Sequence, residues 1–238
     1  LADSMGPPPP PNPPGADKLP AGFLEMLSAQ QEPAQDPTVV AESLLEEDVD
    51  GWRLHGTGAR DLRTDGSSMM ADDTSGTSWF FSAPEKYLGD VREAYGGRLE
   101  FSLGHLHSDS RGMTPPVGND VELFSARDST TLARRGLVKP WVYASTFEVH
   151  LDTSNEWVDV TTGEVATEEG IERVLGALSA LRIRGGHYAG RETTWLKHVV
   201  LRRAERMGDP LSIDQLAPSL AYTTTPPDSE PLPPKAPP

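Results

Sequence analysis

Apolar and polar residues alternate along several short stretches of the chain, which is the pattern of strands with one buried face. The clearest stretch runs from Gly97 to Leu103, where leucine or phenylalanine occupies every second position from Leu99. A longer one, Trp141 to Leu151, places aromatic and aliphatic residues on one face in the same way. Glycines and prolines between such stretches predict turns. Further strands are expected at residues 52–55, 79–82, 121–124, 181–184 and 195–201, with a glycine-rich loop at 56–66.

One stretch inside this region has helical spacing instead. Thr167 is placed to be its N-cap, and Glu168 and Glu169 suit the positive end of the helix dipole. Its apolar positions are Ile171, Val174, Leu175, Leu178 and Leu181. Many short strands, glycine turns and one lateral helix predict an all-β fold, a two-sheet jelly-roll β-sandwich. Leu103→Asp should unfold it by burying an unpaired charge between the sheets, and unchanged thermal stability would show that this strand is misplaced.

Proline crowds the two ends of the chain, at residues 7–14 and 226–238. Because proline fixes φ and has no N–H to donate, both segments predict polyproline II conformation. The expected organisation is a disordered Pro-rich acidic arm at residues 1–48, a sandwich domain at 49–206 and a disordered Pro-rich tail at 207–238.

The Pro-rich arms have two interpretations. They are stiff spacers, or they are ligands for the grooves of profilin-like or SH3-like domains. Retention of such a domain by a peptide of residues 5–16 would favour the second. Within the first arm, short helices at residues 21–31 and 39–47 are the alternative to disorder.

The formal net charge of −15 lies mostly in the arms. Residues 1–50 carry ten acidic residues against one lysine, whereas residues 51–206 carry 22 acidic and 19 basic residues. Nucleic acids and anionic membranes attract proteins with surplus lysine and arginine, so neither is expected as the main partner. Acidic arms are expected to be solvating segments, or docking segments for a basic partner.

The chain has no cysteine, which excludes a disulfide framework, a thiol nucleophile and a thiolate metal site. No signal peptide or membrane-spanning run is visible, and the chain begins with Leu1, so we expect a fragment of a longer protein that does not insert into a membrane. The sequence has no P-loop, GxSxG or HExxH motif, and no pair of carboxylates stands out for glycoside hydrolysis. We therefore do not expect an enzyme.

A 25-residue block has an order and spacing that point to a family. Residues 79–103 read WFFSAPEKYLGDVREAYGGRLEFSL, with an aromatic run, an Ala-Pro pair, a Tyr-Gly-Gly turn and an alternating strand. This block resembles the laminin IV type A domain, a β-sandwich related to galactose-binding-like domains that lies between the cysteine-rich repeats of laminins and perlecan. Weaker matches to the family lie at residues 46–52, 141–157, 166–188 and 195–201, so that the resemblance covers about residues 49–205.

The resemblance implies a non-catalytic structural or adhesion module of an extracellular matrix or surface protein, with protein partners or glycans. Two alternatives remain open. One is a carbohydrate-binding module of the galactose-binding-like type, which exposed aromatic residues on one sheet or loop edge would favour. The other is an intracellular scaffold that uses its polyproline arms.

Several residues are candidates for ligand contact. Tyr188 and His187 lie between glycines, and Arg182 could hold a carboxylate or sulfate with two hydrogen bonds. Arg184, in the position of the family's "IR" element, is expected to be structural and paired with an acid. Tryptophans could stack on a sugar ring, although most of them are expected in the core. They are Trp52, Trp79, Trp141, Trp157 and Trp195.

Galactose-binding-like sandwiches often hold a structural calcium near their first and last strands, and the resemblance implies the same place here. Oxygens could come from Glu46, Glu47, Asp48 and Asp50. The last strand departs from the family, because Lys197 stands where a carboxylate is expected and would repel the cation. The acidic run is then a solvated strand edge, or a salt-bridge partner for Lys197.

A second metal hypothesis concerns one strand end. His105, His107 and Asp109 would lie on one side of an extended strand, at a spacing that suits metal ligands. The alternative is a strand end that runs into a loop at residues 108–116.

Overall fold

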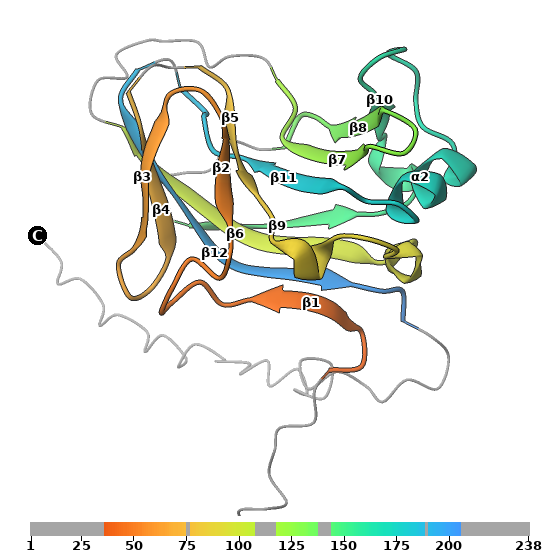
Figure 1. The fold of residues 1–238 in the computed structure, drawn as a ribbon, viewed down its shortest axis with the longest axis horizontal. Helices are drawn as coiled ribbons and strands as arrows, with labels where there is room; N and C mark the ends of the chain where they lie inside the picture. Colours follow the sequence, from red (N-terminus) through yellow and green to blue (C-terminus); the bar gives the residue numbers. More distant parts are fainter. Residues whose placement is uncertain (1–35, 75–76, 108–117, 138–143, 189, 206–238) are drawn as a thin grey trace, which may run out of the picture. The chain divides into compact units, whose positions relative to one another are not determined.

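The computed structural model describes residues 36–74, 77–107, 118–137, 144–188 and 190–205 (Figure 1). These residues form two antiparallel sheets packed face to face, as the alternating pattern predicted. No helix among them has the length and apolar character needed to cross a membrane. The predicted Pro-rich arms and Trp141 lie outside the described residues.

The first sheet has the order β3-β4-β12-β6-β9, with β1 also paired to β12. Its strands are β1 (Val39–Ser43), β3 (Ala59–Thr64), β4 (Met69–Asp73), β6 (Arg98–His107), β9 (Ser145–His150) and β12 (Glu192–Arg202). The second sheet has the order β10-β8-β7-β11-β5-β2. Its strands are β2 (Arg53–Gly56), β5 (Trp79–Ser82), β7 (Val121–Ser125), β8 (Thr130–Arg134), β10 (Val158–Asp159) and β11 (Ala180–Arg184).

The core lies between the two sheets and is filled by the apolar positions of the alternating stretches. Leu99, Phe101 and Leu103 of β6 are almost fully buried, as the prediction for Leu103 requires. The Phe101 ring stacks on that of Phe147 in the neighbouring strand β9, with centroids 5.3 Å apart. Burial of such side chains contributes about 1.5–3 kcal/mol each, so this interior supplies most of the stabilisation of the fold.

The helix expected at residues 39–47 is wrong, because Val39–Ser43 forms strand β1. β4 pairs with β12 only as far as Leu196, and β1 pairs with residues 199–202 beyond it. A helix at this position would leave the backbone groups of that half of β12 unpaired on one side. The first sheet therefore includes residues upstream of position 49.

The loop expected at residues 56–66 is also wrong, because β3 lies within it and pairs with β4. The glycines form the turn before β3, where Gly56 and Gly58 have φ of 99° and 104°. β3 lies at the edge of its sheet and carries only exposed or partly buried residues, so it has no apolar alternation to reveal it.

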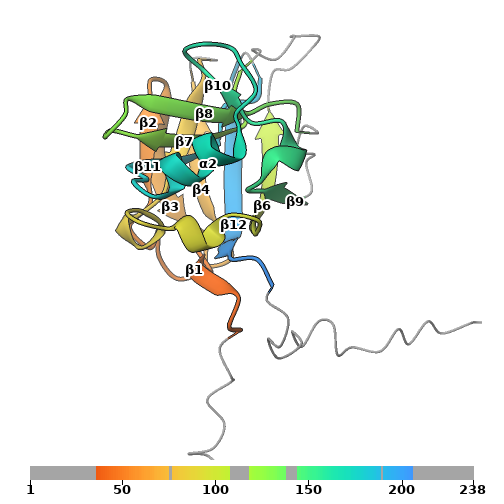
Figure 2. The same ribbon diagram turned by 90° about the vertical axis from the view of Figure 1, so that its right-hand side faces the viewer.

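The predicted helix is α2 (Glu168–Leu175), and Thr167 caps it by accepting a hydrogen bond from the Gly170 N–H at 3.1 Å. The helix ends before Leu178 and Leu181, which are buried as parts of the following bridge and strand. The apolar spacing predicted too long a helix, because Leu178 and Leu181 continue that spacing although they lie beyond the helix end. α2 lies beside β7 and β8, away from the outer surface of the first sheet (Figure 2).

Three short 3₁₀ helices, η2 (Glu85–Tyr87), η3 (Arg92–Ala94) and η4 (Thr153–Asn155), connect strands. The Tyr-Gly-Gly turn follows η3. A Cβ on Gly97 would lie 2.1 Å from the carbonyl oxygen of Arg202, so only glycine allows β6 to begin this close to the end of β12.

Candidate functional site

The structure separates the three residues that were predicted to bind a ligand. Arg182 lies on β11, where its Nη1 is 3.1 Å from a carboxylate oxygen of Glu122 and its guanidinium is 5.8 Å from the Phe124 ring centroid. His187 and Tyr188 instead lie near His105, whose ring centroid is 6.4 Å and 4.7 Å from theirs. A common site for all three residues therefore has no geometric support.

His187 and Tyr188 belong to a polar cluster inside one end of the sandwich. Both backbone N–H groups donate to Oε1 of Glu192, at 2.7 Å and 3.4 Å. His105 and Glu192 are buried, and Oε2 of Glu192 has no hydrogen bond with any described residue. Burial raises the pKa of Glu192 to about 7, with a further increase from Asp73 that the two N–H donors and Arg184 oppose.

Arg184 is structural, as expected. Its Nη1 lies 3.5 Å from an oxygen of Asp120, and its Nε donates to the Gly186 carbonyl at 2.6 Å. The side chain is almost fully buried, so it is held between these groups and not presented to a ligand.

The structure tests only part of the hypothesis that His105, His107 and Asp109 bind a metal. His105 faces the interior beside Tyr188, and Asp109 lies outside the described residues. Among the residues that the structure does describe, no group of three His, Cys, Asp or Glu side chains is arranged to hold a metal.

The side chain of Lys86 pairs with the acidic run at residues 46–50. The ammonium group of Lys86, from η2, donates to the Asp50 carboxylate and to the Glu42 carbonyl oxygen. Burial raises the pKa of Asp50, but hydrogen bonds from Lys86 and Ser43 outweigh it and lower the pKa below its ordinary value. Asp50 thus pairs with Lys86, so the alternative partner Lys197 is wrong for this residue, and an oxygen already neutralised by an ammonium does not fit calcium.

Glu47 and Asp48 do not complete a cation site around Asp50 either. Oδ1 of Asp48 accepts a hydrogen bond from the backbone N–H of Asp50 at 2.6 Å, and Asp50 has a positive φ of 46°. This local turn uses Oδ1 of Asp48 as an acceptor, and Glu47 is exposed. The run is therefore best described as a solvated turn closed by Lys86.

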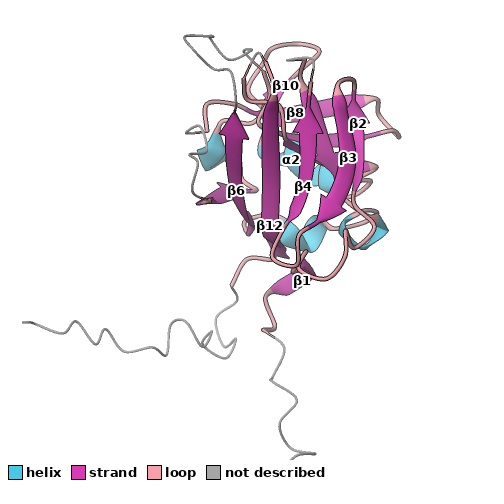
Figure 3. Cartoon of the chain, turned by 90° about the vertical axis from the view of Figure 1, so that its left-hand side faces the viewer, coloured by secondary structure: helices cyan, strands magenta, loops and turns pink. Residues whose placement is uncertain are grey.

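The four described tryptophans divide into two kinds. Trp52, Trp79 and Trp157 are buried in the core, as was expected of most of them. Trp195 is only partly buried and lies on the outer surface of the first sheet, which the described helices leave uncovered (Figure 3).

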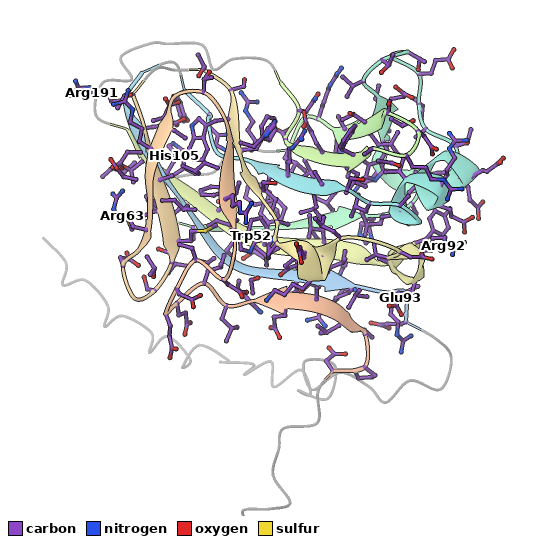
Figure 4. The ribbon with its side chains drawn as sticks, in the orientation of Figure 1. Trp52, Arg63, Arg92, Glu93, His105 and Arg191 are labelled. Atoms are coloured by element: carbon purple, nitrogen blue, oxygen red, sulfur yellow. The ribbon has the colours of Figure 1, made fainter. Side chains whose placement is uncertain are left out.

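The surface around Trp195, here called the open face, is formed by β3, β4, β12 and β6. In the ladder, Trp195 is opposite Met70 on one side and Gly104 on the other, and Thr193 is opposite Asp72 and Leu106. Arg63 extends the face at the outer strand β3, on the same side of the molecule as Arg191 (Figure 4). Its residues are Arg63, Met70, Asp72, Gly104, Leu106, Thr193 and Trp195.

Sequence reasoning named only Trp195 from this face. The alternation along β12 could have revealed more residues of this face, because Thr193 and Trp195 alternate with the buried Thr194 and Leu196. Arg63 and Asp72 could not be found in the same way, because β3 and β4 were not recognised as strands.

The comparisons with known proteins agree with the resemblance. The sequence model of the family described as Laminin B (Domain IV) matches residues 80–216, more than half of the 238 residues. The chain is 30% identical over 129 residues to the basement membrane proteoglycan of Caenorhabditis elegans. The match covers 53% of this chain and only 4% of that protein.

The L4b domain of human laminin alpha-2 has a similar structure, with a TM-score of 0.56 and 11% identity over 70% of this chain and 98% of that domain. A family 11 carbohydrate-binding module of Clostridium thermocellum gives a TM-score of 0.42 at 13% identity, over 71% of this chain and 99% of that module, which supports no argument about function. The laminin likeness shows the same two-sheet fold. The chain belongs to the Laminin B (Domain IV) family, the laminin IV domains.

Proposed function

We propose that this chain is a non-catalytic structural or adhesion module of an extracellular matrix protein. Membership of the laminin IV family is the observation that carries the proposal. The similarity to a protein described as a basement membrane proteoglycan supports an extracellular location. Because the chain matches only 4% of that protein, the partners and activity of the whole protein are not transferred to it.

The arrangement of the first and last strands supports a module that is displayed to one side of its parent protein. β1 and β12 are antiparallel neighbours, and Val39 pairs with Arg202, so the sandwich receives and releases the chain at adjacent points (Figure 1). A domain joined in this way adds little length to a linear array. Its uncovered surface is then available to neighbours in the matrix.

The test is the location of the native protein. An antibody raised against residues 36–205 should stain unpermeabilised tissue and follow the detergent-insoluble matrix fraction on extraction. Staining that requires permeabilisation and follows the cytosolic fraction would reject the proposal and favour the scaffold alternative. In that case, capture of profilin or an SH3 domain by a peptide of residues 5–16 would be the next measurement.

A further inference from the structure

Apolar side chains on the open face are in contact with solvent. Leu106 is 56% exposed, and Trp195 and Met70 beside it are only partly buried. Trp195 also leaves its indole N–H without a hydrogen-bond partner among the described residues. Apolar surface that faces water costs free energy, and a partner that covered it would remove that cost.

Gly104 leaves room for the Trp195 ring beside β6. A Cβ at position 104 would lie 2.5 Å from Nε1 and 2.6 Å from Cε2 of Trp195, so the indole lies directly across the backbone of β6. Any other residue would push the ring away from the sheet. The absence of a side chain at this position therefore lets the Trp195 ring lie against β6, and this ring is here called the platform.

A hydrogen-bonded polar edge borders the platform. Arg63 donates from Nη1 and Nη2 to the two oxygens of Asp72, at 2.9 Å and 3.1 Å, and Thr193 donates to Oδ1 of Asp72 at 2.7 Å. These three bonds use part of the acceptor capacity of the carboxylate, which is about four lone-pair sites, so Asp72 can accept another donor. Arg63 and Asp72 remain 43% and 34% exposed.

A pocket of about 470 Å³ continues this edge toward the ends of β4 and β12. It is lined by Asp72, Asp73, Thr74, Leu106, Arg191, Glu192 and Thr193. Arg191 is exposed and forms no ion pair with a described residue. The volume falls within the range typical of small-molecule pockets, about 300–1,000 Å³.

These features together specify the chemistry of a ligand. A pyranose ring has one apolar face of C–H groups that can lie on an indole, and hydroxyl groups at its rim that both donate and accept hydrogen bonds. Trp195 matches the first property, and Asp72, Thr193 and Arg63 match the second. The two arginines and three acidic residues around the face and pocket have no cationic surplus, which argues against a sulfated or phosphorylated ligand.

We propose that the open face binds a neutral oligosaccharide, with one sugar ring stacked on Trp195 and its hydroxyl groups bonded to Asp72, Arg63 and Thr193. The adjoining pocket receives the next sugar unit. This inference goes beyond the structural role proposed above and does not depend on it, because it rests on the geometry of one sheet surface.

The experiment is a binding measurement on the full 238-residue chain. A glycan array that includes maltohexaose, cellohexaose, mannopentaose and N-acetyllactosamine oligomers identifies binders, and calorimetric titration gives their dissociation constants. A sulfated heparin-derived hexasaccharide is included as the charged comparison. The proposal expects saturable binding of at least one neutral oligosaccharide and weaker or no binding of the sulfated one.

Three variants locate the binding. Trp195→Ala removes the platform, Gly104→Ala retains the indole but displaces it, and Asp72→Asn removes the charge from the polar edge. Each should weaken binding by about tenfold or more, the effect expected when one stacking or charge-assisted contact is lost. Val165→Ala is the matched control, because it removes a 62% exposed apolar side chain elsewhere and should leave affinity unchanged.

Several results would overturn the proposal. They are an array without a neutral binder, binding of the sulfated hexasaccharide alone, and affinity that is unchanged in both Gly104→Ala and Asp72→Asn. Thermal unfolding of every variant is measured first. If Trp195→Ala does not fold, the other two variants decide the outcome, because their substitutions change little of the buried core.

Discussion

Two tryptophans of this domain lie over glycine, one inside the sandwich and one outside. A Cβ on Gly185 would come within 2.1 Å of the Trp79 ring, and one on Gly104 within 2.5 Å of the Trp195 ring. Trp79 is fully buried and meets the edge of Phe81, with ring centroids 5.0 Å apart. Trp195 is only partly buried and lies on the outer side of the first sheet, opposite to the buried Thr194 and Leu196.

A glycine beside a tryptophan ring therefore has two different consequences in this domain. Inside, the glycine lets the indole fill the core so closely that Nε1 of Trp79 has no hydrogen-bond partner among the described residues. An unpaired N–H costs about 1–3 kcal/mol, so the burial of the large ring must outweigh it. Outside, the glycine lets the indole lie against β6 on the outer side of the sheet. Location in the fold determines whether the arrangement stabilises the domain or equips it to bind.

Truncation of the two rings should separate these consequences most clearly. Trp79→Ala should lower the free energy of unfolding by about 3–5 kcal/mol, because it leaves a cavity in the core. Trp195→Ala should cost about 1 kcal/mol or less, because one side of the ring faces open surface. Denaturant unfolding of both variants measures the difference, and equal losses would show that Trp195 belongs to the core.

Substitution of the two glycines should show the same contrast with smaller losses of stability. Gly185→Ala should cost about 3 kcal/mol, because the buried Trp79 ring has no space into which it can move. Gly104→Ala should cost under about 1 kcal/mol, because the Trp195 ring can tilt outward. Thermal melting compares the two, and a larger loss for Gly104→Ala would contradict the outward position of Trp195.

The inward side of β12 should make the stability of the domain depend on pH. The pKa of Glu192 is raised from 4.5 to about 7, so the folded protein keeps this proton to a higher pH than the unfolded chain does. Its contribution is fully present below pH 4.5 and is lost as the pH rises toward 7, an effect on the order of 3 kcal/mol.

Glu192→Gln tests this contribution. The amide can still accept from the two N–H groups but carries no charge, so the stability of the variant relative to the native protein should rise as pH increases between 4.5 and 7. Melting temperatures of the variant and of the native protein across this range measure the difference. A difference in melting temperature that does not change with pH would show that the Glu192 carboxyl lies in a more polar environment than its burial indicates.

An exposed ion pair should have the smallest effect. Lys86→Met removes the partner of Asp50 and of the Glu42 carbonyl oxygen, but Lys86 and Asp50 are 40% and 37% exposed. The expected loss is therefore about 0.5 kcal/mol, measured by denaturant unfolding and reduced by added salt. A loss comparable to that of Gly185→Ala would show that Lys86 holds β1 in the sheet.

Parts of the domain that bury an alternating or helical face could be read from the sequence. The strands at Trp79–Ser82 and Arg98–His107, and the start of α2 at Thr167, follow from apolar spacing and capping chemistry. β1 and β3 were missed because their conformation depends on partners distant in the sequence. The proposed contacts of His187 and Tyr188 with a ligand stay predictions, whereas Arg182 proved to have an acidic partner.

The sequence by itself determined the family, the two-sheet architecture and most of the core, because these depend on residue type and on spacing along one strand at a time. Only the tertiary structure decided that Asp50 meets Lys86, that Glu192 holds His187 and Tyr188, and that Trp195 lies over Gly104 beside Asp72. Each of these depends on which strands become neighbours and in what register. Pairing between strands far apart in the chain is set by the packing of the whole sandwich, so no local pattern contains it.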